Sequence, residues 1–485
     1  MASFKKNLIY QTAYQVLATV LPLITTPYVS RVLGATNLGI YSYAATYANY
    51  FAVVAMLGFS NYGGKSIAGS KADTDSLVEM YFGIRKLQLI SSSLMMILYV
   101  AFVLIFQRDN LALYAIEAIW IINCFIDVNW FFFGLEEFKL TVTRNLIIKL
   151  LSIVGIFAFV RTANDLLIYA LILVIGTTIS DIYLLLKVKK WIPYRKKVSI
   201  KASLVHLKPV IVLFVPILAM TLYHQMDKTM LGLLSTYEEV GYYYNADKII
   251  NILLGVITGL GTVSLPRMTA LLAQGKKDEY KNILEKSVAV VMIACSAVVF
   301  GITAVSEEFV PLFFGEGYEA CIPLLSKLSF VIYFKAIGAI LVNQVLLPHD
   351  KEKAYIIAVF AGAGVNFVAN SIMIRLWGAL GAVIATIIAE FLVCVVEIFL
   401  SREVVNVLSL LKNSLVYPVV GLLMFISVRL LMNFINIQQA IVALTVEILF
   451  GAGVFCMLCI FYWRLTKDTI GKYISSMLLH KFKRK

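Results

Sequence analysis

Long apolar segments separated by short polar breaks run along the whole chain. Fourteen of these segments are about 20 residues long, which is the length an α-helix needs to cross the hydrocarbon core of a bilayer. The pattern therefore predicts an all-α, polytopic membrane protein with about 14 transmembrane helices. The predicted spans are residues 8–33, 39–59, 87–106, 111–133, 140–160, 166–186, 209–234, 242–265, 288–305, 321–347, 354–374, 379–400, 414–432 and 440–462.

Composition separates this chain from soluble proteins. Of its 485 residues, 61% are hydrophobic and only 14% are charged, whereas soluble domains carry about 25% charged residues. The four His and six Cys residues are scattered, so we expect no metal site, no cofactor and no disulfide framework. Because the sequence contains no long polar segment that would form a catalytic domain, functional groups are expected to lie between the helices.

The positive charges assign an orientation to the predicted spans. If the amino terminus and every second connection share one side, that side carries 31 of the 42 Lys and Arg residues and the opposite side only 3. Short loops rich in Lys and Arg stay in the cytoplasm, so both termini are predicted to be cytoplasmic. Lys5 and Lys6 lead directly into the first span, which we expect to act as its own insertion signal rather than as a cleaved signal peptide.

One connection, residues 187–208, carries eight Lys or Arg residues and no Asp or Glu. Such a segment either binds anionic headgroups of the inner leaflet or acts as a topology determinant and linker between two halves of the chain. We favour the second interpretation. Nucleic-acid binding is not indicated, because cytoplasmic loops explain the net charge of +14 and a nucleic-acid surface needs a folded basic face with stacking aromatic residues.

An internal repeat relates the two halves of the chain. Each copy places a cation, a Leu-Gly pair and a Gly-x-Tyr triplet at one hairpin. The copies are residues 31–44 (RVLGATNLGIYSYA) and 228–246 (KTMLGLLSTYEEVGYYYNA). Six spans separate the copies, which predicts two six-helix lobes related by a pseudo-two-fold axis along the membrane normal. The expected organisation is an N-lobe (1–186), the basic linker (187–208), a C-lobe (209–400), and a last region (401–485) with two further helices and a basic cytoplasmic tail.

Sixteen charged residues, eight of each sign, fall inside the predicted spans. Each costs about 2.5 to 3.5 kcal/mol at a helix centre, so each needs a partner, water or a function. Arg31, Lys228 and Lys248 lie in the outer parts of spans one, seven and eight, where they are expected to form the closed end of a cavity. The adjacent acids Asp227 and Asp247 point about 100° away from the lysines, so each pair can direct its cation inward while its acid bonds elsewhere. The alternative for each cation is a structural salt bridge or snorkelling to the interface.

Four further charged residues receive weaker assignments. Arg144 and Lys149, in the inner half of the fifth span, either line the cytoplasmic mouth of the cavity or snorkel to the interface, and snorkelling is preferred. Glu390 and Glu397 share one face of the twelfth span. A carboxylate there would take a coupling H⁺ or Na⁺, although a structural role is preferred.

Several motifs match a known family. The chain resembles the bacterial polysaccharide repeat-unit flippases at residues 127–139 (DVNWFFFGLEEFK) and 143–145 (TRN). These flippases are a family of the multidrug/oligosaccharidyl-lipid/polysaccharide exporter superfamily. Residues 227–243 resemble the same family, as does the segment from Asn366 and Asn370 through a Gly-Ala-Leu-Gly-Ala stretch to Glu390. The two asparagines also form a polar stripe that fits either a coupling-ion site in a wet cavity or interhelical hydrogen bonds.

The resemblance implies the fold of multidrug extruders and lipid II flippases. It also implies a substrate of undecaprenyl pyrophosphate that carries an oligosaccharide of capsule or O-antigen type, moved by alternating access to the outer leaflet of the bacterial cytoplasmic membrane. Membrane lipids and polysaccharide polymerase machinery are the implied partners. In lipid II flippases a cation near the end of the first span and an acid–base pair on the eighth line the lumen, and Arg31 and Asp247-Lys248 stand at comparable places. Lys248 replaces a typical Arg, which weakens bidentate phosphate binding but keeps the charge.

Three alternatives stay open. The first two are a lipid II flippase and a multidrug or cation antiporter of the same fold, the latter with an anion-dominated cavity. The third is a membrane-embedded polysaccharide polymerase, an enzyme that generally needs a sizeable outer loop with catalytic side chains. Because the longest predicted outer loop is only 306–320, we expect a transporter rather than an enzyme and assign no catalytic residues.

Overall fold

The computed structural model of the chain describes residues 2–262, 265–435, 437–466 and 471, with side chains described except those of residues 2–20, 138 and 260–262. The predicted basic tail after residue 466 therefore lies outside the described residues, apart from residue 471. All regular structure in the described ranges is helical. Ten helices in these ranges are long and apolar enough to cross a membrane. The prediction of an all-α, multi-pass membrane protein is confirmed.

Each of the fourteen predicted spans coincides with a helix or a run of helices. Two pairs of spans are merged, because α1 (Ala2–Met56) and α15 (Glu352–Ser401) each continue through a kink. The kinks lie at Gly34, with φ of 77°, and Gly378, with φ of 55°, a region of backbone conformation that favours glycine. Nine further spans are α3 (Thr74–Phe106), α4 (Leu111–Ile126), α6 (Phe138–Phe159), α7 (Leu166–Lys187), α9 (Leu207–Leu234), α10 (Tyr237–Thr262), α12 (Lys277–Phe314), α17 (Val416–Phe434) and α18 (Ala440–Thr466).

Two predicted spans differ from a continuous helix. The fourth ends at Ile126 rather than at residue 133, and a short helix, α5 (Asn129–Gly134), follows. The Asp127 carboxylate accepts a hydrogen bond from the backbone N–H of Asn129 at 2.7 Å, a local turn that competes with helix continuation. The tenth span is divided into α13 (Cys321–Leu328), α14 (Val331–Ile340) and a six-residue π-helix, Leu341–Leu346.

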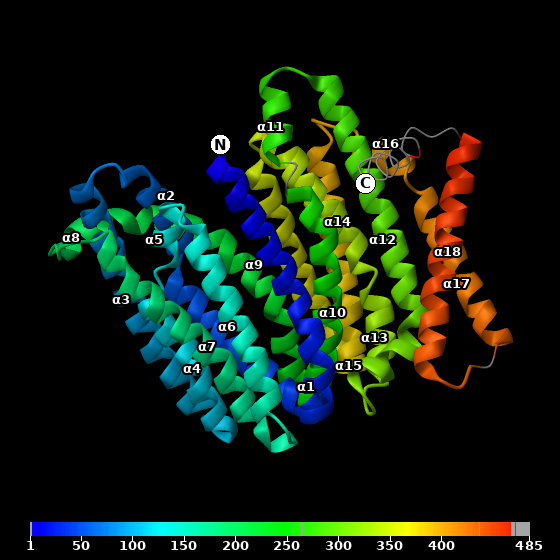
Figure 1. Ribbon diagram of the computed structural model, residues 1–485, viewed down its shortest axis with the longest axis horizontal. Coiled ribbons are helices and arrows are strands. Elements are labelled where there is room, and N and C mark those ends of the chain that lie inside the picture. Colours follow the sequence, from blue (N-terminus) through cyan, green and yellow to red (C-terminus); the bar gives the residue numbers. More distant parts are fainter. Residues whose placement is uncertain (1, 263–264, 436, 467–470, 472–485) are drawn as a thin grey trace. The chain divides into compact units, whose positions relative to one another are not determined.

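Residues 1–244 form one compact unit. Helices α1, α3, α4 and α7 share an apolar core that includes the fully buried Tyr99 and Ile121, and they lie in the blue to green part of Figure 1. A second core forms where α2 (Phe59–Ser70), α3 and α5 meet around Trp130. On the outward faces, large apolar side chains such as Ile97 (66%) and Val154 (63%) are exposed, as expected for a surface in contact with lipid.

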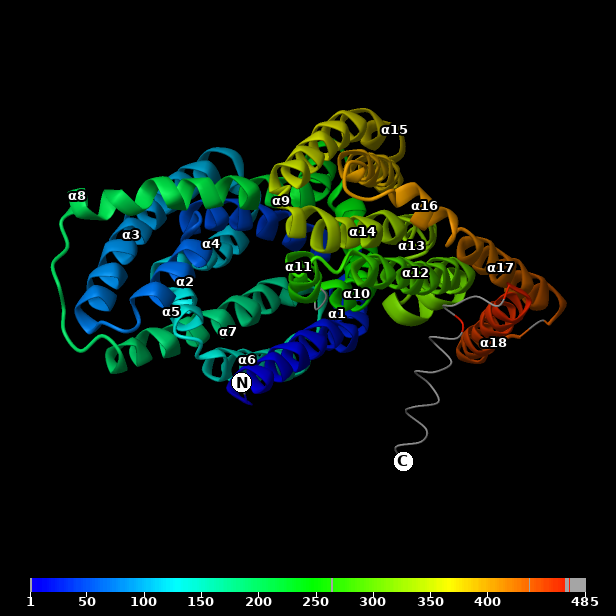
Figure 2. The same ribbon diagram turned by 90° about the horizontal axis from the view of Figure 1, so that it is seen from above.

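The basic linker is attached to α3 within this first unit. Lys196 pairs with Glu79 at 2.8 Å, and Lys86 donates to the backbone oxygen of Val198 at 2.8 Å. The hydrogen bond to Glu79 raises the pKa of Lys196 above its ordinary value. Figure 2 shows the segment running from α7 to α8 (Ile200–Ser203). The linker therefore has a defined path along the first unit.

Residues 245–485 form the second compact unit, which also contains α11 (Leu265–Ala273) and α16 (Val407–Lys412). Helices α17 and α18 lie side by side (Figure 1) and pack against α12. Arg429 joins the three helices, since its guanidinium lies 3.6 Å from Glu308 and 3.4 Å from Glu447, and it also contacts Glu307. The first unit includes α9 and the start of α10, so the two lobes inferred from the repeat stay a prediction.

Candidate functional site

The adjacent residues Asp227 and Lys228, on α9, have different surroundings. Asp227 is 5% exposed, and its carboxylate accepts a hydrogen bond from the Tyr243 hydroxyl at 2.5 Å. Lys228 is half-buried, and its ammonium lies 5.7 Å from the ring centroid of Tyr244, within the range of a cation–π interaction. As expected for neighbours on a helix, the acid bonds into the protein while the lysine side chain keeps part of its surface accessible.

The two copies of the repeat meet inside the first unit. A Cβ atom on Gly39 would overlap the backbone of Tyr237, and one on Gly241 would overlap the backbone of Ala35. Both glycines are therefore needed for the close approach of α1 to the start of α10. Arg31 lies one turn before the Gly34 kink, with an exposed side chain. The hairpin that carries Arg31 is thus packed against the hairpin that carries Lys228.

A layer of polar and aromatic side chains joins α1 to α9 next to this contact. The Tyr50 hydroxyl lies 3.0 Å from the Thr229 hydroxyl, and Thr46 donates to Gln225 at 3.3 Å. Tyr43 and Tyr47 pair through their hydroxyls at 3.1 Å. Through Tyr50 and Thr46 this layer connects α1 to α9, the helix that carries Lys228.

The second unit contains the Asp247 and Lys248 pair on α10. Both side chains are half-buried. The Asp247 carboxylate accepts a hydrogen bond from the Asn251 side chain, one turn later, at 2.6 Å. This pair thus repeats the pattern of Asp227 and Lys228, in that the acid has a partner supplied by the protein.

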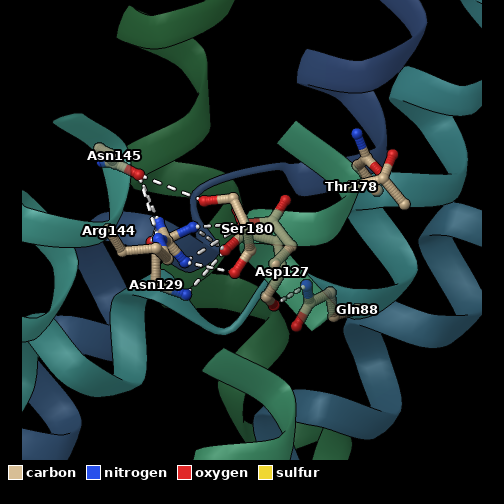
Figure 3. Close-up of polar contacts among 9 residues, drawn as sticks. Gln88, Asp127, Asn129, Arg144, Asn145, Thr178 and Ser180 are labelled. Carbon is tan, nitrogen blue, oxygen red and sulfur yellow. Dashed lines mark hydrogen bonds and ion pairs between the residues drawn. The ribbon is translucent and has the colours of Figure 1, made fainter. Parts of the chain in front are cut away.

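Figure 3 shows a different arrangement around Arg144. Arg144 is only 8% exposed, and its guanidinium donates to the backbone oxygen of Ser180 and to the Asn129 side chain, both at 2.9 Å. It also lies 3.8 Å from the Asp181 carboxylate. Asn129 in turn donates to Asp127 at 2.7 Å and to Asp181 at 3.2 Å. The snorkelling interpretation is wrong for Arg144, because the side chain turns inward to these partners.

The same cluster extends to α3 through Gln88. Its amide donates to the backbone oxygens of Cys124 and Asp127, each at 2.8 Å, and accepts from the Trp130 indole at 3.2 Å. Residues 127–130 therefore connect α3, α5, α6 and α7. Sequence reasoning singles out this motif, counts Asp181 only as one of the sixteen charged residues within spans, and gives Gln88 no role. Neither residue carries a local sequence signal for its partners.

The first half of α6 also borders a groove. Arg144, Lys139 and Tyr183 line this groove, which has a volume of about 580 Å³ and runs between α6 and α7. Lys149, further along α6, is exposed and does not line the groove. The structure thus separates the two residues that the sequence pairs as a cytoplasmic mouth.

The acids of α15 lie in the interior of the second unit. Glu390 pairs with Lys335 of α14 at 3.2 Å. Glu397 is 2% exposed and lies against Gly338, where a Cβ atom would come within 2.6 Å of its carboxyl oxygen. Asn370 donates to Asn366 at 3.0 Å, and both are buried. Among the described residues no group of three His, Cys, Asp or Glu side chains is placed to hold a metal ion.

Comparison with known proteins gives consistent matches. The family model described as "Polysaccharide biosynthesis protein" matches residues 4–272. A protein of Escherichia coli K12 named "Putative O-antigen transporter" is 22% identical over 398 residues, which are 81% of this chain and 95% of the relative. A protein of the same name from Shigella dysenteriae is 24% identical over 282 residues, which are 58% of this chain and 70% of the relative.

Solved structures with the same fold belong to membrane transporters. An inward-closed lipid II flippase, MurJ, has a TM-score of 0.68 at 14% identity, covering 95% of this chain and all of its own. An inward-facing multidrug resistance transporter of the MATE family, in the MOP superfamily, has a TM-score of 0.62 at 15% identity, covering 84% of this chain and 99% of its own. At these identities the likeness establishes the fold, as predicted.

Proposed function

The chain belongs to the family of polysaccharide biosynthesis proteins, and we propose that it is a flippase for oligosaccharide repeat units linked to undecaprenyl pyrophosphate. The repeat unit, of O-antigen or capsule type, moves from the inner to the outer leaflet of the cytoplasmic membrane. The names of the bacterial relatives and the lipid II flippase fold support this proposal. Protein groups that replace the hydration of a diphosphate lower the barrier for crossing the hydrocarbon layer, so no chemical step is needed.

The placement of Lys228 carries the proposal. This lysine lies on an apolar helix with an accessible part of its side chain, while the neighbouring Asp227 is buried against Tyr243. A cation that lies within the membrane with part of its surface accessible can form charge-assisted hydrogen bonds to a diphosphate. The proposed headgroup site also includes Arg31, Asp247 and Lys248. At its periphery, on the cytoplasmic side, we propose Arg144 and Lys149.

The contact between the repeats suggests how access alternates. Gly39 and Gly241 bring the two hairpins into backbone contact, on the side predicted to face away from the cytoplasm. In the proposed cycle this contact closes the outer end while the headgroup enters from the cytoplasm, and it opens when the lobes 1–186 and 209–400 rock against each other. Helices α17 and α18 of the region 401–485 stay outside the two lobes.

We propose that buried residues of α15 couple transport to the binding of an ion. Glu390 is paired with Lys335 and Glu397 is buried beside Gly338, so a change in the protonation of either carboxyl would alter the packing of α14 on α15. Asn366 and Asn370 contribute amide groups on the same long helix. A coupling H⁺ or Na⁺ at these residues is part of the proposal.

The proposal is tested by reconstituting the full chain in vesicles with defined lipids. Undecaprenyl-pyrophosphate-linked repeat units, lipid II and a cationic drug are supplied to separate vesicle batches, and translocation is followed by enzymatic labelling or dye release. We expect translocation of the oligosaccharide lipid above that in protein-free vesicles, and little of the other two. Selective movement of lipid II or of the drug would instead assign one of the two alternative transporter functions. Polymerised glycan as the product would assign the polymerase.

A further inference from the structure

Glu117 is a buried acid that none of the clusters described above contains. It lies in the middle of α4 with 0% of its surface exposed. Neither of its two carboxyl oxygens has a hydrogen-bond partner among the described residues. The indole of Trp120, on the same helix, interacts with the carboxyl, but at a geometry that falls short of a hydrogen bond.

Three tyrosines surround Glu117, one from each long helix that packs on α4. Tyr41 of α1, Tyr99 of α3 and Tyr169 of α7 each interact with it electrostatically. The Tyr99 hydroxyl donates to the backbone oxygen of Tyr114 at 2.8 Å and is therefore occupied. The short helix η1 (Arg108–Asn110) packs on the start of α4 and brings one charge of each sign, but neither is among the groups that act on Glu117.

Among the described residues Glu117 is the one buried acid with both carboxyl oxygens unpartnered, whereas Glu397 and Glu447 each have one such oxygen. Several other buried acids have partners. Asp127 and Asp181 accept hydrogen bonds from Asn129, and Glu390 pairs with a lysine. An ionised carboxylate at Glu117 would be buried without any such compensation, which is strongly unfavourable. In this arrangement of helices the side chain is therefore stable only as the neutral acid.

We propose that Glu117 is a proton-binding site whose proton holds α1, α3, α4 and α7 in the arrangement seen here. Loss of the proton requires water or a new hydrogen-bond donor at the carboxyl, and neither enters without separating these helices. Proton release and helix rearrangement are thus linked, and a conformation that admits water binds the proton more weakly. This part of the proposal is independent of the substrate.

A second consequence rests on the proposed function. Tyr169 also interacts with Tyr244, and the Tyr244 ring lies under the ammonium group of Lys228. A negative charge at Glu117 would oppose the binding of an anion near Lys228, and protonation removes that opposition. Binding of the diphosphate headgroup and of the proton should therefore favour each other.

The test uses the full chain in lipid nanodiscs with isotope-labelled glutamate, and infrared spectroscopy detects the carbonyl band of protonated carboxyl groups. We expect a band at neutral pH that disappears in Glu117→Gln and is unchanged in Glu285→Gln, an exposed acid on α12. An identical band in the wild type and in Glu117→Gln would overturn the proposal. If Glu117→Gln does not fold, Glu117→Asp takes its place, and the isotope-labelled band should be replaced by an unlabelled carbonyl band from the aspartic acid.

Inorganic pyrophosphate then serves as the probe for the second consequence. Its affinity for the wild type should fall roughly tenfold as the pH rises through the titration of the infrared band, and it should be independent of pH in Glu117→Gln. Equal pH dependence in both proteins would overturn the link to Lys228. Absence of pyrophosphate binding at any pH, with the infrared result as expected, would contradict the proposed function and leave the proton site established.

Discussion

Two cations of the first unit, Arg144 and Lys228, both lie within apolar helices but have different surroundings. The acid near Arg144 is on another helix, whereas the acid near Lys228 is its neighbour in the sequence. Arg144 is 8% exposed and is enclosed by Ser180, Asn129 and Asp181. Lys228 is half-buried and rests on an aromatic ring, while Asp227 is held by Tyr243. Arg144 is therefore part of a buried polar network, whereas Lys228 keeps part of its side chain accessible, as the proposed headgroup site requires.

The largest effect is expected from Arg144→Ala. Removing one member of a buried charge network leaves Asp181 and Asn129 without their partner, at a cost of about 3–5 kcal/mol in the free energy of unfolding. The melting temperature of the purified chain and its yield in the membrane should both fall. Arg161→Ala, at an exposed position in a loop, is the control and should leave both unchanged. A wild-type melting temperature for Arg144→Ala would show that the network does not contribute to stability.

Asn129→Ala should have the next largest effect. The Asn129 amide connects Arg144 to both Asp127 and Asp181, so its loss leaves buried groups unsatisfied at about 2–3 kcal/mol. Thermal unfolding measures the change. In the double variant with Arg144→Ala the two losses should be less than additive, because the residues act in one network. Full additivity would show that they act separately.

Tyr243→Phe tests the surroundings of Lys228. The variant removes the hydroxyl that donates to Asp227, at about 1.5 kcal/mol for a hydrogen bond to a charged group. The freed carboxylate can then turn towards Lys228, so we expect weaker pyrophosphate binding than in the wild type with only a modest fall in melting temperature. Tyr242→Phe, next to it on α10, is the matched control. Unchanged pyrophosphate binding in Tyr243→Phe would show that the orientation of Asp227 does not affect anion binding.

The smallest effect is expected from Lys196→Ala in the linker. The pair with Glu79 is exposed to solvent, and exposed ion pairs contribute little because water and salt screen them. Translocation should be unchanged, whereas proteolysis of residues 191–208 should become faster. A loss of translocation in Lys196→Ala would give the linker a role beyond attachment to α3.

Much of the fold follows from the sequence in physical terms. The length of a bilayer-spanning helix limits each apolar segment, so hydropathy predicts the helices. Hydropathy does not predict that two pairs of spans continue through kinks at Gly34 and Gly378, where the backbone conformation favours glycine. The fourth span ends early because Asp127 bonds to the backbone of Asn129. Hydropathy does not register that competition, since the residues that follow, Trp130 and Phe131, are apolar.

The candidate site is less accessible to sequence reasoning. The adjacent positions of Asp227 and Lys228 predict that the two side chains point in different directions. The Asp227 carboxylate contacts Tyr243, and the Lys228 ammonium lies near the ring of Tyr244. The inward turn of Arg144 depends on Ser180 and Asp181, which lie on another helix. The isolation of Glu117 likewise depends on what three neighbouring helices fail to supply. Partners that are distant in sequence carry no local pattern, so only the packed structure distinguishes these residues.

Lys228→Ala provides the most direct test of the central claim, measured as translocation of the oligosaccharide lipid per folded chain in vesicles. The matched control is Lys327→Ala, an exposed lysine on α13. We predict a melting temperature close to that of the wild type for both variants, wild-type translocation for Lys327→Ala, and a drop of at least about tenfold for Lys228→Ala. Translocation at the wild-type rate in Lys228→Ala would contradict the account.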